Sequence, residues 1–169
     1  MSRRHGPRTM LARGVVLGML AACAAGGSPR ERVVPAGDFG TVEREVARLV
    51  NEHRVGRRLP RLSYDTALAT IARAHSGAMA TRRVPLGHDE FARRAAAAGR
   101  IVRLEAVAEN VALNNYDVAR TASVALRGWV RSTHHRENIE GAFDVTGVGV
   151  VRAGDGTFFF TQLFVARRR

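Results

Sequence analysis

The carboxyl-terminal end of the chain carries the pattern that most restricts its fold. Two stretches rich in β-branched and aromatic residues, 145–152 and 157–166, flank the sequence AGDG at 153–156. An Asp-Gly pair between two such stretches predicts a β-hairpin. The second stretch is apolar at nearly every position from Phe158 to Val165, so we expect both of its faces to be covered. This pattern predicts a sheet with helices on each side.

The preceding part of the chain contains four segments in which apolar residues recur at helical spacing. They begin at Asp38 or Thr41, at Asp65, at Glu90 and at Asp117, and Asp or Thr at such a position can cap a helix. Residues 101–107 roughly alternate in polarity, which predicts a strand or an extended approach to Glu109. We therefore predict an α+β domain with helices on both sides of a small, mainly antiparallel sheet.

The amino terminus has the three-part pattern of a secretory signal. Residues 1–13 are basic, and residues 14–22 form an apolar run that is too short to span a bilayer. The run ends in LAAC at 20–23, which resembles a lipobox, so Cys23 would accept a diacylglycerol group. The alternative is an ordinary signal peptide that is cleaved after one of the alanines. Because Cys23 is the only cysteine, no intrachain disulfide can form.

These features predict three parts: a lipoprotein signal peptide at 1–22, a flexible tether at 23–36 and a globular domain at 37–169. The lipid on Cys23 would anchor the exported protein on the outer side of the cytoplasmic membrane or in the outer membrane. The sequence does not distinguish these two membranes.

The chain is strongly basic, with a formal net charge of +12 and arginine as its only basic residue apart from histidine. Such a charge favours weak attraction to anionic lipid heads or wall polymers. Aromatic and basic residues are not interleaved as they are in grooves for single-stranded nucleic acid. We therefore expect no nucleic-acid partner.

Three segments contain histidine, glutamate or asparagine in combinations suited to a site: GHD at 87–89, AENVA at 108–112 and STHHRENI at 132–139. None of them matches a short zinc motif, since HExxH and paired cysteines are absent from the sequence. Any site must therefore be assembled in three dimensions.

The chain resembles the bacterial branch of the CAP family, also called SCP or pathogenesis-related proteins. Five pieces occur in family order across residues 41–166: LVNEHR with LPRL at 49–62, AHSGAMA leading to His88, AENVA at 108–112, WVRSTHHRENI at 129–139, and GVGV at 147–150 followed by FTQLF at 160–164. The resemblance implies an α-β-α sandwich.

The family resemblance also implies a cavity lined by two histidines and two acids, which binds a divalent metal in some members. His88 matches the first histidine and Glu109 the glutamate. The second acid and second histidine fall at Ser132 and Phe159, so only half of that tetrad is present. His135, in the HRxNI segment of bacterial members, would complete a His88–Glu109–His135 cluster suited to Zn²⁺; Asn110 and Ser132 would line the same cleft.

Each candidate also has a structural interpretation. His75 lies on an apolar helical stripe, where a hydrogen-bonded core role is expected. Glu109 and Asn110 would anchor a loop, and His135 and Arg136 would follow a helix end. We expect His134 to be exposed, Asn138 to form a turn and Trp129 to lie in the core.

The favoured function is a surface-tethered, non-catalytic module that binds a lipid, a wall fragment or another small molecule in this cleft. The alternatives are a metal-dependent hydrolase and a structural envelope protein with a vestigial cleft.

Overall fold

The computed structural model describes residues 39–168. The elements in this part are α1 (Gly40–Gly56), β1 (Ser63–Tyr64), α2 (Thr66–Ala80), α3 (Phe91–Gly99), β2 (Leu104–Asn114), α4 (Val118–Arg131), α5 (Thr133–Glu140), β3 (Val145–Arg152) and β4 (Phe158–Arg167). The predicted signal peptide, the tether and Cys23 lie outside the described residues and stay predictions.

The strands form one sheet in the order β1-β3-β4-β2. Strands β3 and β4 pair antiparallel across residues 153–156, which confirms the predicted hairpin. Strand β2 pairs antiparallel with β4 at the edge of the sheet, and the short β1 pairs parallel with β3. Strand β2 is longer than predicted: Glu109 and Asn110 lie in its middle, where Glu109 faces Leu163 of β4. Both residues therefore lie on a strand, and the Glu109 side chain binds His88 in the loop between α2 and α3.

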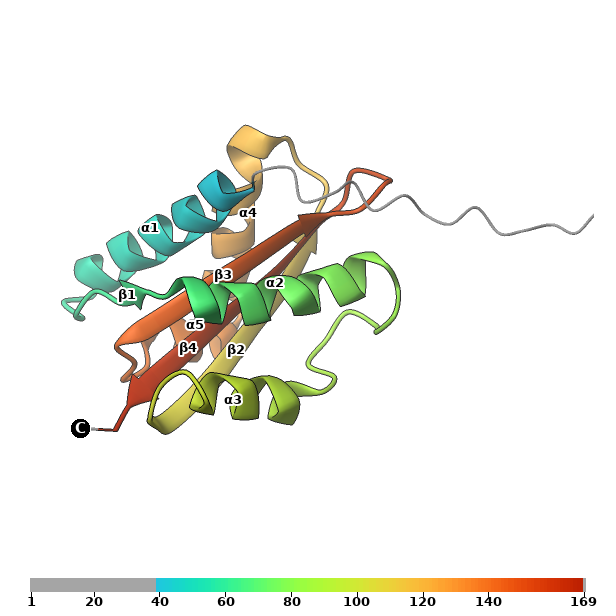
Figure 1. The fold of residues 1–169 in the computed structure, drawn as a ribbon. Coiled ribbons are helices and arrows are strands. Elements are labelled where there is room, and N and C mark those ends of the chain that lie inside the picture. Colours follow the sequence, from blue (N-terminus) through green and yellow to red (C-terminus); the bar gives the residue numbers. More distant parts are fainter. Residues whose placement is uncertain (1–38, 169) are drawn as a thin grey trace, which may run out of the picture. The chain divides into compact units, whose positions relative to one another are not determined.

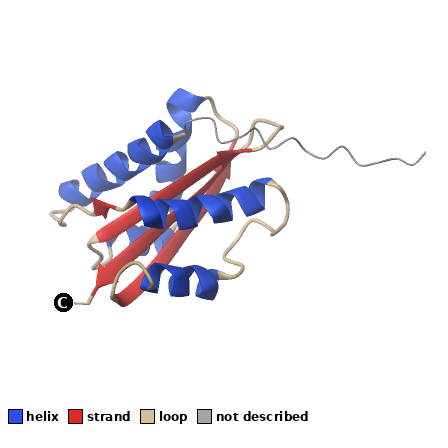
Figure 2. Ribbon diagram, viewed as in Figure 1, coloured by secondary structure: helices blue, strands red, loops and turns tan. Residues whose placement is uncertain are grey.

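Helices cover both faces of this sheet, as predicted (Figures 1 and 2). On one face, α2 and α3 pack through a cluster that includes Leu68 and Ala98. On the other face, α1 and α4 enclose a larger core that contains the buried Trp129 together with Phe158, Phe160 and Phe164 of β4. Strand β4 is buried along almost its whole length, which explains why its sequence does not alternate.

Helix α2 lies directly on β3 because two glycines leave room for its backbone. A Cβ atom at Gly149 would come within 1.9 Å of the Arg73 amide nitrogen, and one at Gly147 within 2.3 Å of the Ala69 amide nitrogen. Any side chain at either position would force the helix away from the sheet. The GVGV sequence is therefore a packing requirement of this interface.

Two of the predicted caps are confirmed. The Asp65 carboxylate accepts hydrogen bonds from the first amides of α2, and Asp117 accepts one from the Arg120 amide in α4. Helix α1 begins after Phe39 with no side-chain cap, so Thr41 does not cap it; Asp38 lies outside the described residues. Helix α5 was not predicted, because its eight residues are mostly polar and bury only Ile139.

Between residues 39 and 168 there is no helix with the length and apolar character that a membrane crossing requires.

Candidate functional site

The centre of the candidate site is a buried carboxylate that is bound by an arginine. Glu109, on edge strand β2, has a side chain that is 1% exposed. Arg94, from α3, donates from Nε to Oε2 at 2.6 Å and from Nη2 to Oε1 at 2.7 Å. This two-point contact is the geometry in which guanidinium and carboxylate bind most strongly. Both oxygens of Glu109 are therefore engaged by a resident cation.

His88 binds the same carboxylate from the loop between α2 and α3. Its Nδ1 lies 2.9 Å from Glu109 Oε1, and its side chain is 46% exposed. A carboxylate that is paired with arginine can only accept, so Nδ1 carries the proton and donates. In the neutral imidazole the lone pair then lies on Nε2. His88 can thus offer an acceptor to a ligand.

Hydrogen bonds on both sides of His88 hold its loop in place. The buried His75 lies 2.9 Å through Nε2 from the Gly87 carbonyl oxygen, to which it donates. Arg94 also donates to the Asp89 carbonyl oxygen at 2.6 Å. The expected hydrogen-bonded core role of His75 is confirmed, and this bond fixes the residue next to His88.

Helix α5 is attached to the same part of β2 through two asparagines. Asn138 donates to the Glu109 carbonyl oxygen at 3.2 Å and to Asn110 Oδ1 at 2.9 Å. Asn110 in turn donates to the His135 carbonyl oxygen at 3.0 Å. Asn138 is therefore not a turn residue, and His135 lies within α5 and not beyond a helix end. These bonds also cover the outer edge of β2, where an unpaired carbonyl would otherwise be exposed.

A pocket of about 310 Å³ opens beside the His88–Glu109 pair. Its lining combines apolar and polar side chains: His88, Phe91, Val107, Ala108, Glu109, His134 and Asn138. His134 is exposed at its surface, as expected. The pocket offers an apolar wall and two imidazoles next to a carboxylate whose charge is already compensated.

His135 and Ser132 belong to a second cleft, of about 500 Å³, farther along β2. This cleft is largely apolar, with Leu86, Leu113 and the core residue Trp129 in its lining. Burial lowers the pKa of His135 from its ordinary value, and the neighbouring His88 and His134 lower it further. The neutral form of His135 is thus favoured.

The structure brings together only part of the predicted metal site. Within residues 39–168, no three His, Cys, Asp or Glu side chains lie where they could jointly hold a metal ion. His88 and Glu109 are in contact, but His135 lines the second cleft and Arg94 occupies both carboxylate oxygens. The residues present therefore do not fit the predicted Zn²⁺ set.

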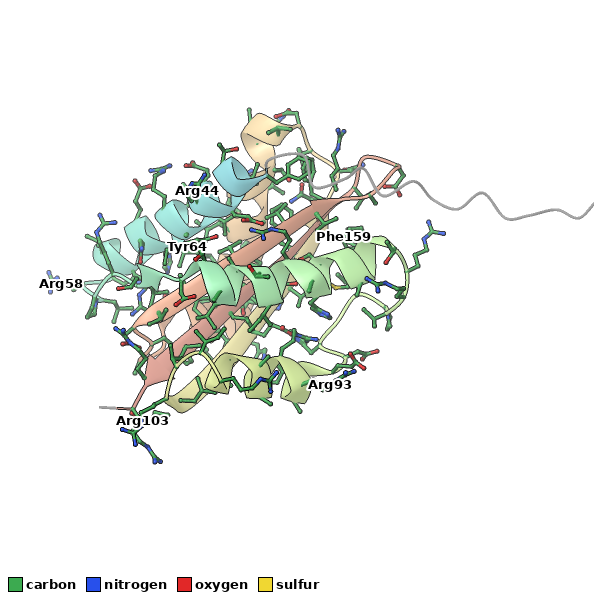
Figure 3. The ribbon with its side chains drawn as sticks, viewed as in Figure 1. Arg44, Arg58, Tyr64, Arg93, Arg103 and Phe159 are labelled. Carbon is green, nitrogen blue, oxygen red and sulfur yellow. The ribbon has the colours of Figure 1, made fainter. Side chains whose placement is uncertain are left out.

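Phe159, which is labelled in Figure 3, stands at the position where the resemblance places the family's second histidine. It packs against a small apolar cluster of Ala80, Val151 and Ala153. The histidine of the family tetrad is thus replaced at this position by an aromatic side chain that packs in an apolar cluster.

Arg94 was missed by the sequence analysis. It lies in FARRAAAAG, four residues before the buried Ala98, and is itself buried. An arginine on the buried side of a short helix requires a buried acid as partner, but alanines lie on both the buried and the exposed sides of this helix and do not mark its buried side in the sequence.

Comparisons with known proteins agree with this architecture. A sequence comparison with curated proteins gives no match. An extracellular protein containing an SCP domain from Bacillus anthracis is 28% identical, with a TM-score of 0.63 over 76% of this chain and 41% of that protein. An outer surface protein from Borrelia burgdorferi is 17% identical, with a TM-score of 0.65 over 82% of this chain and 99% of that protein.

A cysteine-rich secretory protein from Staphylococcus aureus is 19% identical, with a TM-score of 0.60 over 79% of this chain. The present chain spans 41% of the length of this protein and of the Bacillus protein. Residues 47–164 match the CAP family, described as the cysteine-rich secretory protein family. The chain therefore belongs to the CAP family.

Proposed function

We propose that this protein is an exported CAP-domain module that binds a small amphipathic ligand in the pocket at His88 without transforming it. The ligand would be a lipid or a wall-derived fragment, both of which combine apolar and polar parts. The Bacillus protein is extracellular and the Borrelia protein is an outer surface protein, which supports export of this chain as well.

The proposal rests on the observation that Arg94 already binds both carboxylate oxygens of Glu109. A carboxylate that acts as a general base must accept a proton from the substrate or from water. Both oxygens of Glu109 are already bound by Arg94, and its side chain is almost fully buried. What the pocket still presents is a contact surface: the apolar Phe91 and Val107 beside the imidazoles of His88 and His134.

A binding titration tests this proposal. The purified protein is titrated separately with a fluorescent fatty acid and with a labelled muramyl peptide, which represent the two ligand sources. We expect saturable binding of one probe, and we expect Phe91→Ala to weaken it about tenfold, since removing a buried aromatic contact costs more than 1 kcal/mol. Val118→Ala is the matched control, because Val118 is 51% exposed and lies outside the pocket lining.

The same samples distinguish binding from hydrolysis. Mass spectrometry after prolonged incubation should return both probes intact. Probe cleavage that disappears in a Glu109→Gln protein that circular dichroism shows to be folded would support the metal-dependent hydrolase instead. If neither probe binds more tightly to the natural chain than to Phe91→Ala, the pocket has no such ligand and a structural envelope role is favoured.

The membrane anchor is a second part of the proposal, and it rests on the LAAC sequence at 20–23. Lipidation of Cys23 would hold the domain at a membrane surface on the exported side. We expect Cys23→Ser to release the protein from the membrane fraction or to leave it unprocessed, whereas Ser28→Ala should change neither. A Cys23→Ser protein that is processed and still membrane-bound would contradict the anchor.

A further inference from the structure

The His88–Glu109 pair contains the residue types of a metal site, yet it already has a cation beside it. The Arg94 side chain is 9% exposed and makes three hydrogen bonds: two to Glu109 and one to the Asp89 carbonyl oxygen. Arginine keeps its charge at all physiological pH values. The negative charge of Glu109 is therefore compensated permanently from within the domain.

We propose that Arg94 determines the ion specificity of this site: its guanidinium takes the place that a divalent metal would have next to His88 and Glu109, and thereby excludes the metal.

Geometry supports this exclusion. A metal ion would need an oxygen lone pair of Glu109 directed toward it, but Arg94 and His88 together bind Oε1 twice and Oε2 once, which engages three of the about four lone pairs of the carboxylate. Arg94 cannot turn aside easily, because its third bond ties it to Asp89 and α3 fixes its backbone. A metal that entered would thus share one carboxylate with a buried guanidinium.

Charge supports it as well. A divalent cation at the carboxylate would lie a few ångströms from the positive charge of Arg94, and repulsion between such charges is strong where water is excluded. His88 donates its Nδ1 proton to Glu109, which leaves Nε2 as the ring nitrogen with a lone pair, so a metal between His88 and Glu109 would have to displace this proton.

Removal of the guanidinium should reverse this preference. Arg94→Met keeps an unbranched side chain of similar reach but removes the charge and every donor. Glu109 would then be a buried carboxylate next to an imidazole, which is a pair of ligands that Zn²⁺ prefers. We expect the variant to bind one equivalent of Zn²⁺ weakly, through these two side chains with water in the remaining positions, whereas the natural chain binds none at this site.

The test is equilibrium dialysis of the full chain against Zn²⁺, with the bound metal measured by mass spectrometry. The expected extra equivalent in Arg94→Met should be lost in Arg94→Met/Glu109→Gln. Zn²⁺ should also raise the thermal unfolding midpoint of Arg94→Met but not that of the natural chain, since a ligand stabilises the state that binds it. Arg93→Met is the matched control: Arg93 precedes Arg94 on α3, is 79% exposed and pairs with Glu90 (Figure 3).

Two results would overturn the proposal. One is a folded Arg94→Met, as judged by circular dichroism, that binds no more Zn²⁺ than the natural chain. The other is that the natural chain binds Zn²⁺ and that His88→Ala binds one equivalent less. The second comparison does not depend on Arg94 variants: His88 is half exposed, and an equivalent of Zn²⁺ lost in a folded His88→Ala would overturn the exclusion even where Arg94→Met does not fold.

Discussion

Two buried carboxylates in this domain are bound in nearly the same way. The side chain of Glu43 of α1 is 2% exposed and that of Glu109 of β2 is 1% exposed. Arg73 contacts both oxygens of Glu43 at 2.7 and 2.5 Å, as Arg94 contacts those of Glu109 at 2.6 and 2.7 Å. Each carboxylate thus has one arginine that compensates its charge.

The third partner distinguishes them. Glu43 accepts a hydrogen bond from the Val150 amide at 3.0 Å and so ties α1 and α2 to β3. Glu109 accepts its third bond from the half-exposed His88, at the wall of a pocket. The same kind of ion pair therefore joins elements of the core at Glu43, and at Glu109 it positions the His88 side chain beside a pocket. The surroundings of a buried acid, and not its burial, indicate which role it has.

The largest loss of stability is expected at Glu109, because its partner Arg94 is more buried than Arg73, the partner of Glu43. Glu109→Gln leaves Arg94 without its counter-charge in a 9% exposed position, and breaking a buried pair in this way costs about 4 kcal/mol in free energy of unfolding. Urea denaturation of the natural and variant chains measures this. A loss below about 1 kcal/mol would show that Arg94 finds water or another partner.

A smaller loss is expected from Glu43→Gln. Arg73 is 37% exposed and can be hydrated once its partner is neutral, and the glutamine oxygen can still accept from the Val150 amide. We expect a loss of about 2 kcal/mol in the same urea experiment, in the range of a hydrogen bond to a charged group. A loss larger than that of Glu109→Gln would contradict the comparison. Ligand binding should be unchanged, because Glu43 does not line the pocket.

His88→Ala should separate stability from binding. The imidazole is half exposed and its hydrogen bond to Glu109 is additional to the two from Arg94, so we expect a loss of only about 0.5 kcal/mol in free energy of unfolding. Binding of the probe recognised by the natural chain should weaken about tenfold, which corresponds to one lost hydrogen bond. His53→Ala is the control, since His53 pairs with Glu140 away from the pocket. Equal binding by His88→Ala and the natural chain would place the ligand elsewhere.

The smallest expected effect is the pH dependence of stability that His135 causes. Because burial lowers the pKa of His135 below its ordinary value of 6.5, the unfolded chain takes up this proton more readily than the folded chain. The His135 contribution to stability is therefore present above pH 6.5 and is lost as the pH falls through the lower, folded-state value. Thermal unfolding from pH 7.5 to 5 should show a steeper decline for the natural chain than for His135→Gln. Parallel curves would contradict this assignment.

Much of the fold could be predicted because local signals agree with it. The AGDG turn fixed the β3–β4 hairpin, the uninterrupted apolar sequence of β4 required two covering layers, and Asp65 and Asp117 mark helix starts. Helix α5 and β1 could not be predicted in this way. Helix α5 buries a single residue and strand β1 is only two residues long, so neither carries a periodic pattern of apolar residues.

The site could be predicted only in part. The family motifs led to His88 and Glu109, which are in contact. They also suggested His135 as a third ligand, but its side chain lies in the second cleft, while its carbonyl oxygen accepts a hydrogen bond from Asn110. The partner that defines the chemistry, Arg94, comes from an alanine-rich helix with no motif of its own. Its pairing with Glu109 depends on how α3 packs on the sheet, which local sequence does not encode.

The central claim is that Glu109 is held by Arg94 and in turn holds His88 through Nδ1. A two-dimensional ¹H–¹⁵N NMR spectrum of the imidazole nitrogens, assigned with His88→Ala and recorded at pH 8 with and without excess Zn²⁺, tests it directly. The account predicts a protonated Nδ1 and an unprotonated Nε2 for His88, with both signals unmoved by Zn²⁺. A protonated Nε2, or signals that shift on addition of Zn²⁺, would contradict it.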